Sequence, residues 1–175
     1  MRKVVLTYGV LAGVIIVALM VISFSVLSFS EGSSMSMVLG YATMIVSLSM
    51  IFFGIRNYRD NYSGGAITFG RGFLIGLYIT LIASAFYVVG WKIYSSIAFP
   101  DFADKYAAQM VNSLKASGAT DAAILAKTKE MADWKQMYAN PFVEIGMTFL
   151  EIFPVGLLIS VICALILKLK PKVGG

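Results

Sequence analysis

The sequence predicts an all-α polytopic membrane protein with four transmembrane helices and a helical hairpin outside the lipid. Of its 175 residues, 59% are apolar and 13% are charged, about half the charged share that is usual in soluble domains. Apolar runs near the length of about 20 residues that a bilayer core requires recur four times. Charged residues gather between and beyond these runs, as is typical of a chain that crosses a membrane repeatedly.

The first apolar run covers residues 4–29 and follows Arg2 and Lys3. A signal peptide also begins with basic residues, but its apolar core is about 7–15 residues long and ends at small residues. This run is longer, and Ser28 and Ser30 make a poor cleavage site. We therefore interpret it as a retained transmembrane helix. A polar turn at residues 31–34 is expected to lead into the second span, residues 35–55.

A polar, glycine-rich segment, GIRNYRDNYSGGAITFGRG, lies at residues 54–72 and is expected to form a loop followed by an interfacial turn at residues 67–69. It is not a phosphate-binding loop of the Walker type, because no lysine and hydroxyl pair follows its glycines. Nor does it match a dinucleotide fingerprint, which follows a strand. Its three arginines, Arg56, Arg59 and Arg71, either bind anionic lipid head groups or a phosphorylated ligand or only fix the topology.

The third span is predicted at residues 73–92, where Lys92 marks the edge and Trp91 and Tyr94 form an interfacial aromatic belt. Residues 100–140 differ in kind, because lysines and acids balance there. They predict a hairpin of two helices, residues 101–116 and 121–138, with Gly118 as a C-cap and Thr120 as an N-cap. Apolar residues recur at three- and four-residue steps in its second helix, an amphipathic pattern: Ile124, Leu125, Met131, Trp134, Met137 and Tyr138.

The fourth span is predicted at residues 142–167, after an N-cap and first-turn proline at Asn140-Pro141. Pro154 is expected to kink it. If both termini are cytoplasmic, the cytoplasmic side of the membrane carries nearly all basic residues outside the hairpin. The hairpin, on the opposite side, is close to neutral. This satisfies the positive-inside rule. The basic residues on the cytoplasmic side, opposed only by Asp60, are Arg2, Lys3, Arg56, Arg59, Arg71, Lys168, Lys170 and Lys172.

The residue inventory argues against most enzyme classes. The chain has no histidine, which removes the commonest general base and zinc ligand. Its single cysteine, Cys163, lies in an apolar run and cannot form an intrachain disulfide. We expect no catalytic, cofactor-binding or metal-binding residue and no cofactor.

Glu151 is the charged residue least expected where it stands, because it lies near the middle of the fourth span. A carboxylate there is costly and is expected to face the interior of the bundle. Glu144, almost two turns earlier, is expected on the same face with Thr148 between them. This polar stripe either relays protons or holds a cation, or it only supports packing, with a protonated Glu151 bonded to Ser84, Tyr87 or a backbone carbonyl. Lys92 and Glu144 are expected near the outer interface, where they form either a rim ion pair, which we favour, or an ion gate.

Small residues recur along three of the predicted spans. Gly9 and Gly13 do so in the first span, and two further stripes follow at four-residue steps. Such stripes let helix backbones approach closely in lipid, either within one bundle or between two copies. The further stripes are Gly72, Gly76, Thr80 and Ser84 in the third span, and Gly156, Ser160 and Ala164 in the fourth.

Three segments resemble a known family: GIRNYRD at residues 54–60, GGAITFGRGFLIG at residues 64–76, and PDF at residues 100–102, after the aromatic stretch with Trp91. The sequence resembles the bacterial domain-of-unknown-function 4199 proteins. The resemblance implies a small four-helix protein of the bacterial inner membrane. It supplies no catalytic or binding residue.

The function that these features favour is a non-enzymatic membrane module that binds lipid or a partner protein through the hairpin or the arginines. The alternative is a small oligomeric transporter or channel that uses Glu151. A membrane enzyme that uses carboxylates, tyrosines and arginines ranks third. The expected partners are membrane lipids and a protein partner or a second copy of the chain, and no nucleic acid.

Overall fold

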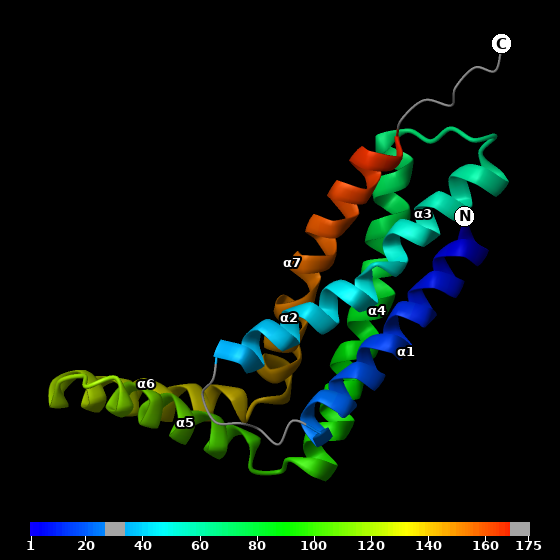
Figure 1. The fold of residues 1–175 in the computed structure, drawn as a ribbon. Helices are drawn as coiled ribbons and strands as arrows, with labels where there is room; N and C mark the ends of the chain where they lie inside the picture. The colour runs from blue at the N-terminus through cyan, green and yellow to red at the C-terminus, as the bar shows by residue number, and fades with distance from the viewer. Residues whose placement is uncertain (27–33, 169–175) are drawn as a thin grey trace.

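The computed structural model describes residues 1–26 and 34–168. The regular structure of this part of the chain is entirely α-helical (Figure 1). The helices are α1 (Arg2–Val26), α2 (Ser34–Leu48), α3 (Met50–Tyr62), α4 (Phe69–Ala98), α5 (Phe102–Ala116), α6 (Asp121–Tyr138) and α7 (Pro141–Leu167). Within the described residues, four stretches are long and apolar enough to cross a membrane, as predicted: Arg2–Ser25, Val38–Tyr62, Phe69–Ala98 and Pro141–Leu167.

Helix α4 is the central element of the bundle, because it packs against α7, α1 and α3 (Figure 1). Contacts between α1 and α4 advance in the same direction along both helices, from Gly9 beside Ile82 to Gly13 beside Phe86. Helix α7 runs the opposite way. The start of α1, the end of α3, the start of α4 and the end of α7 therefore share one end of the bundle, which we call the basic end.

Backbones approach closely along α4 and α7 because small residues recur there every fourth position. Gly72, Gly76, Thr80 and Ser84 are buried on α4. A Cβ atom added at Gly76 would lie 2.8 Å from the Cβ atom of Ser160 on α7. Rows of residues four apart form the ridges that let two helices interlock. The predicted stripes thus pack within one bundle, where Thr80 and Ser160 also share a hydrogen bond of 3.2 Å.

Helices α3 and α4 both extend beyond the predicted spans. The prediction that a loop begins at Gly54 is therefore wrong. Helix α3 continues to Tyr62, and α4 begins at Phe69 instead of residue 73 and ends at Ala98 instead of residue 92. The helix continues because Gly54 and Ile55 are buried in the bundle. The true connection is residues 63–68, in which Gly64 and Gly65 take positive φ angles of 61° and 81°. Ile67 is buried in the core, so it does not form a separate interfacial turn.

Helices α5 and α6 form the predicted hairpin, which projects from the other end of the bundle (Figure 1). The Thr120 hydroxyl accepts a hydrogen bond from the Ala123 amide, so the predicted N-cap is confirmed. The C-cap of α5 is Ser117, and Gly118 directly after it ends the helix with a φ angle of 75°. The amphipathic pattern of α6 is only partly used. Met131 is buried, whereas Leu125 and Met137 are exposed, because α6 packs mainly against α5 and makes few contacts with α7.

The last helix begins as predicted, with the Asn140 side chain accepting a hydrogen bond from the Phe142 amide. Pro154 lies inside α7, which is helical on both sides of it. Of the turn predicted at residues 31–34, Ser34 is instead the first residue of α2, and residues 31–33 lie outside the described part of the chain. Ser28, Ser30, Lys170 and Lys172 also lie outside it.

Candidate functional site

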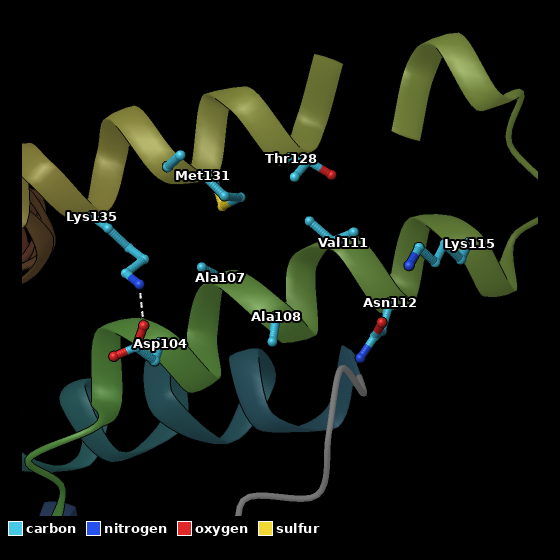
Figure 2. Close-up of a pocket in the computed structure, with 10 residues that line it drawn as sticks. Asp104, Ala107, Ala108, Val111, Asn112, Lys115, Thr128, Met131 and Lys135 are labelled. Atoms are coloured by element: carbon cyan, nitrogen blue, oxygen red, sulfur yellow. Dashed lines mark hydrogen bonds and ion pairs between the residues drawn. The ribbon is translucent and has the colours of Figure 1, made fainter. Parts of the chain in front are cut away.

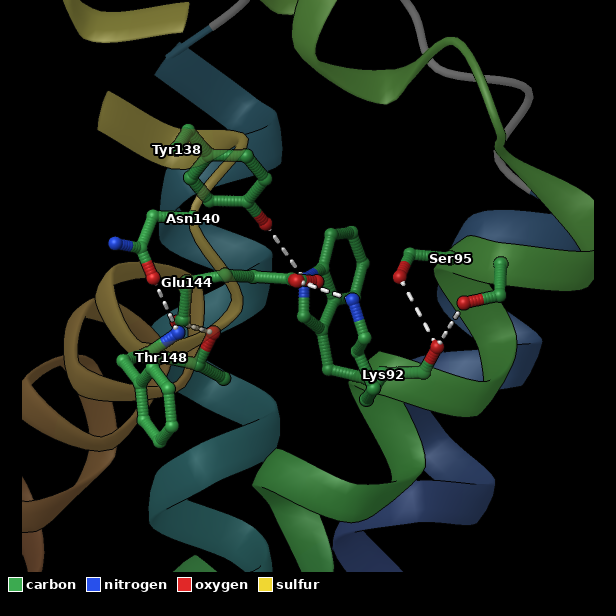
Figure 3. A network of polar contacts seen from close by, with 9 residues as sticks. Lys92, Ser95, Tyr138, Asn140, Glu144 and Thr148 are labelled. Carbon is green, nitrogen blue, oxygen red and sulfur yellow. Dashed lines mark hydrogen bonds and ion pairs between the residues drawn. The ribbon is translucent and has the colours of Figure 1, made fainter. Parts of the chain in front are cut away.

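The ion pair predicted between Lys92 and Glu144 forms at the end of the bundle that carries the hairpin. Lys92 Nζ lies 2.5 Å from Glu144 Oε2, joining α4 to the first turn of α7 (Figure 3). The Glu144 side chain is 9% exposed and that of Lys92 is 46% exposed, so the cation reaches a nearly buried carboxylate from outside. Burial weakens screening by solvent, so the attraction between the two charges is stronger than in an exposed pair, and losing the cation would leave a nearly buried carboxylate unpaired.

Thr148 does not connect Glu144 with Glu151. Its hydroxyl donates a hydrogen bond of 2.8 Å to the backbone carbonyl of Glu144, one turn earlier on α7. Such a bond within a helix satisfies the hydroxyl locally. The side chain is buried with Glu144 and belongs to the packing face between α7 and α4.

Glu151 is exposed at the edge of the α4–α7 contact, so the prediction that it faces the interior of the bundle is wrong. Its side chain is exposed, whereas Glu144, Thr148 and Ile152 are buried. The buried stripe advances in steps of four residues, each about 40° beyond a full turn, so it winds around the helix. Over the interval from Glu144 to Glu151 the packing face turns away, and the two carboxylates do not share one face.

Tyr87 is the side chain that contacts Glu151. Its hydroxyl donates a hydrogen bond of 3.3 Å to Glu151 Oε2, although the tyrosine itself is buried on α4. Of the partners predicted for Glu151, the structure brings Tyr87 to it. Ser84 lies buried without a hydrogen-bond partner for its hydroxyl in the described part of the chain.

Aromatic residues join the hairpin to the bundle, and the sequence did not reveal this junction. The indole nitrogen of Trp91 donates a hydrogen bond of 2.9 Å to the Tyr138 hydroxyl (Figure 3). Phe102 packs edge-on against Trp91, at 4.8 Å between ring centroids, and Trp134 stacks on Tyr138 at the same distance. Burial raises the pKa of Tyr138. The hydrogen bond and ring contacts of this junction together hold the hairpin in a fixed direction relative to the bundle.

The basic end brings together positive side chains from different helices. Arg56 and Arg59 both contact Asp60, at 3.6 Å and 2.7 Å between charged atoms. The Arg56 side chain is nevertheless 57% exposed. Arg71 is exposed on the first turn of α4, where Thr68 caps the helix. Arg2 and Lys3 at the start of α1 and Lys168 after α7 lie at the same end.

The hairpin contains a groove of about 480 Å³ between α5 and α6 (Figure 2). Short side chains such as Ala107, Ala108 and Val111 line it, which explains why the two helices leave space between them. Asp104 and Lys135 form an ion pair at its end nearer the bundle. Among the described residues, no group of three or more histidine, cysteine, aspartate or glutamate residues is placed to hold a metal ion.

Four long apolar helices and a polar hairpin define the class of the protein, a multi-pass membrane protein. The family described as "Protein of unknown function (DUF4199)" matches residues 7–169, which is nearly the whole chain. The protein belongs to this family. No curated protein and no solved structure matches the chain.

Proposed function

We propose that the protein lies in the bacterial inner membrane with both termini in the cytoplasm and the hairpin outside. The distribution of charge at the two ends of the bundle supports this orientation. The basic end carries positive side chains from α1, α3, α4 and the end of α7, with Asp60 as the acid among them. Lysine and arginine near membrane spans are retained on the cytoplasmic side.

The function proposed for this orientation is that of a non-enzymatic membrane module which binds anionic lipid head groups at its basic end. The observation that carries the proposal is the position of Arg56 and Arg71 on neighbouring helices, both exposed at the level where phosphates would lie. A guanidinium group can donate two parallel hydrogen bonds to a phosphate. Asp60 neutralises one positive charge, so the basic end keeps a net positive charge from its other basic residues.

The depth of the arginines fits this proposal. Arg71 and Lys92 are both on α4, and their separation along the helix axis is about 32 Å. The hydrocarbon core of a bilayer is about 30 Å thick. With Lys92 at the outer boundary, Arg71 reaches the inner boundary, where anionic phosphates attract basic side chains by about 1 kcal/mol each.

Lipid retention tests the proposal. The full chain in mild detergent is titrated with phosphatidylglycerol or phosphatidylcholine, and bound lipids are counted by native mass spectrometry. We expect preferential retention of phosphatidylglycerol, which salt weakens. Replacing Arg56, Arg59 and Arg71 with glutamine is expected to remove the preference. The matched control replaces three hairpin lysines with glutamine: Lys115, Lys127 and Lys129.

The outcomes separate the sources of phosphate. Competition by millimolar inorganic phosphate would show that the basic end binds a soluble phosphorylated ligand instead of a lipid. An unchanged lipid preference in the triple arginine variant would contradict the proposal and reduce these arginines to topology determinants. Loss of the preference in the hairpin variant would move the site to the hairpin.

Transport through Glu151 is the second candidate, and the position of the carboxylate limits it. Glu151 is exposed on the outer surface of α7, so a path through the middle of one bundle would not include it. A transporter or channel that used Glu151 would need its path at a contact between copies. Ion flux in liposomes that is lost in Glu151→Gln would favour this candidate over lipid binding.

A further inference from the structure

Glu151 lies at the edge of the contact between α7 and α4, beside the exposed surface of α7. Met147, Pro154 and Leu158 lie on the same side of the helix and are exposed. In a membrane, this apolar surface faces acyl chains. Glu151 lies about 10 Å along the helix from Glu144, toward the basic end. Since Glu144 pairs with Lys92 at the boundary, Glu151 lies within the hydrocarbon.

Among the described residues, the helices that pack near Glu151 place no positively charged side chain on it. From α4, Tyr87 reaches it, while Lys92, five residues further along α4, pairs with Glu144. From α6, Tyr138 accepts a hydrogen bond from Trp91. Helix α2 also packs on α7, and its titratable residue is Tyr41, with no charged residue in the helix. The basic residues at the end of α3 belong to the opposite end of the bundle.

We propose that Glu151 is a proton-binding site on the lipid-facing surface, occupied by an exchangeable proton in the resting protein. An ionised carboxylate without a counter-ion in hydrocarbon costs several kcal/mol, whereas the neutral acid avoids most of this penalty. The Tyr87 hydroxyl satisfies one oxygen of the acid and fixes its position. Because Glu151 is exposed, its carboxyl group is accessible to a reagent or a proton acceptor that arrives through the lipid.

The proposal predicts a specific chemical modification, because hydrophobic carbodiimides react with carboxylic acids inside membranes. The acid proton moves to one carbodiimide nitrogen while the carboxylate oxygen bonds to the central carbon. The O-acylisourea then rearranges to a stable N-acylurea. Nothing leaves, so the adduct adds the full mass of the reagent. The reaction consumes the proton that we assign to Glu151 and needs no other reactant.

Labelling of the full chain with dicyclohexylcarbodiimide tests the site. We expect one adduct, located on Glu151 by peptide mass spectrometry, and loss of at least nine-tenths of it in Glu151→Gln. Glu144→Gln is the matched control, because Glu144 lies on the same helix but is buried and paired with Lys92. That variant is expected to keep the adduct. A water-soluble carbodiimide should label exposed hairpin acids such as Asp104 and Glu130 and leave Glu151 unmodified.

Infrared spectroscopy gives a second readout that does not depend on a reagent. A protonated Glu151 contributes a carboxylic acid C=O band near neutral pH, which shifts in D₂O and is absent from Glu151→Gln. Tyr87→Phe is expected to keep the band and move it to higher wavenumber, because a hydrogen bond to the C=O oxygen is lost. Absence of both the adduct and the band in the folded protein would overturn the proposal. Equal labelling of Glu151 by the water-soluble reagent would also overturn it.

This site is independent of lipid binding at the basic end. It involves α7 and α4 near the hairpin end, and neither Glu151 nor Tyr87 is among the residues proposed to contact head groups. Loss of lipid preference in the arginine variants would leave the carbodiimide adduct unchanged. The two proposals can therefore fail separately.

Discussion

The α4–α7 pair and the α5–α6 hairpin are both antiparallel helix pairs, yet they are packed in different ways. Glycines and small polar residues place the backbones of α4 and α7 in close contact, with Thr80 and Ser160 buried between them. In the hairpin, Ala107 and Met131 are the buried residues of α5 and α6, and a groove of about 480 Å³ remains.

The difference follows from what surrounds each pair. Lipid provides no hydrophobic driving force between helices, so α4 and α7 depend on close van der Waals contact. The hairpin buries little apolar surface of its own and depends on the aromatic junction at Trp91 and Tyr138. We infer that α4 and α7 form the stable unit and that the hairpin unfolds locally at lower free energy.

The largest effect is expected from Gly156→Leu. A side chain there would overlap Thr80 on α4, so the helices would have to separate. We expect a loss of about 3 kcal/mol or more, seen as a lower thermal midpoint and aggregation in mild detergent. Gly146→Leu is the matched control on the same helix, because a Cβ atom at Gly146 meets nothing within 4 Å. Equal damage from both variants would refute the idea that close packing stabilises the pair.

A smaller effect is expected from Lys92→Met at the end of the same interface. The substitution leaves the nearly buried Glu144 without its cation, which should cost about 2 kcal/mol of unfolding free energy because Lys92 itself is half exposed. Adding Glu144→Gln should recover most of the loss, since the unpaired charge is removed. Denaturant-induced unfolding in detergent measures both variants. A double variant as unstable as Lys92→Met would show that lost packing is responsible.

The sequence was sufficient to predict the four spans because long apolar runs constrain a chain directly, and the caps at Thr120 and Asn140 are local signals. The helical course of residues 54–62 was missed for a physical reason. Glycine, asparagine and aspartate favour loops, but burial of Gly54 and Ile55 against the bundle overrides these local preferences. That burial depends on helices distant in the sequence.

The candidate sites were predicted unevenly. The pairing of Lys92 with Glu144 could be predicted because both residues mark the same end of adjacent spans. The exposure of Glu151 depends on the winding of the packing stripe, which the spacing of two carboxylates does not reveal. The bond between Trp91 and Tyr138 joins a span to the hairpin and left no local sequence signal.

Met131→Ala tests whether the hairpin unfolds independently of the bundle. Met131 is the buried residue of α6, and the groove beside it gives neighbouring side chains room to adjust. We expect a local loss of about 1–2 kcal/mol, at or below the low end for such truncations. Hydrogen exchange should accelerate in α5 and α6 and stay unchanged in α4 and α7. Faster exchange throughout the protein would mean that both pairs unfold together.

The smallest effect is expected from Asp104→Asn, which removes the ion pair with Lys135 on the hairpin. The chemistry matches that of the Lys92 variant, but the side chains of Asp104 and Lys135 are 65% and 40% exposed. Water and salt screen such a pair, so the change should stay below about 0.5 kcal/mol by local hydrogen exchange in α5 and α6. Lys115→Gln, at the other end of the groove, controls for loss of charge alone. A loss as large as that of Lys92→Met would show that burial does not distinguish the two pairs.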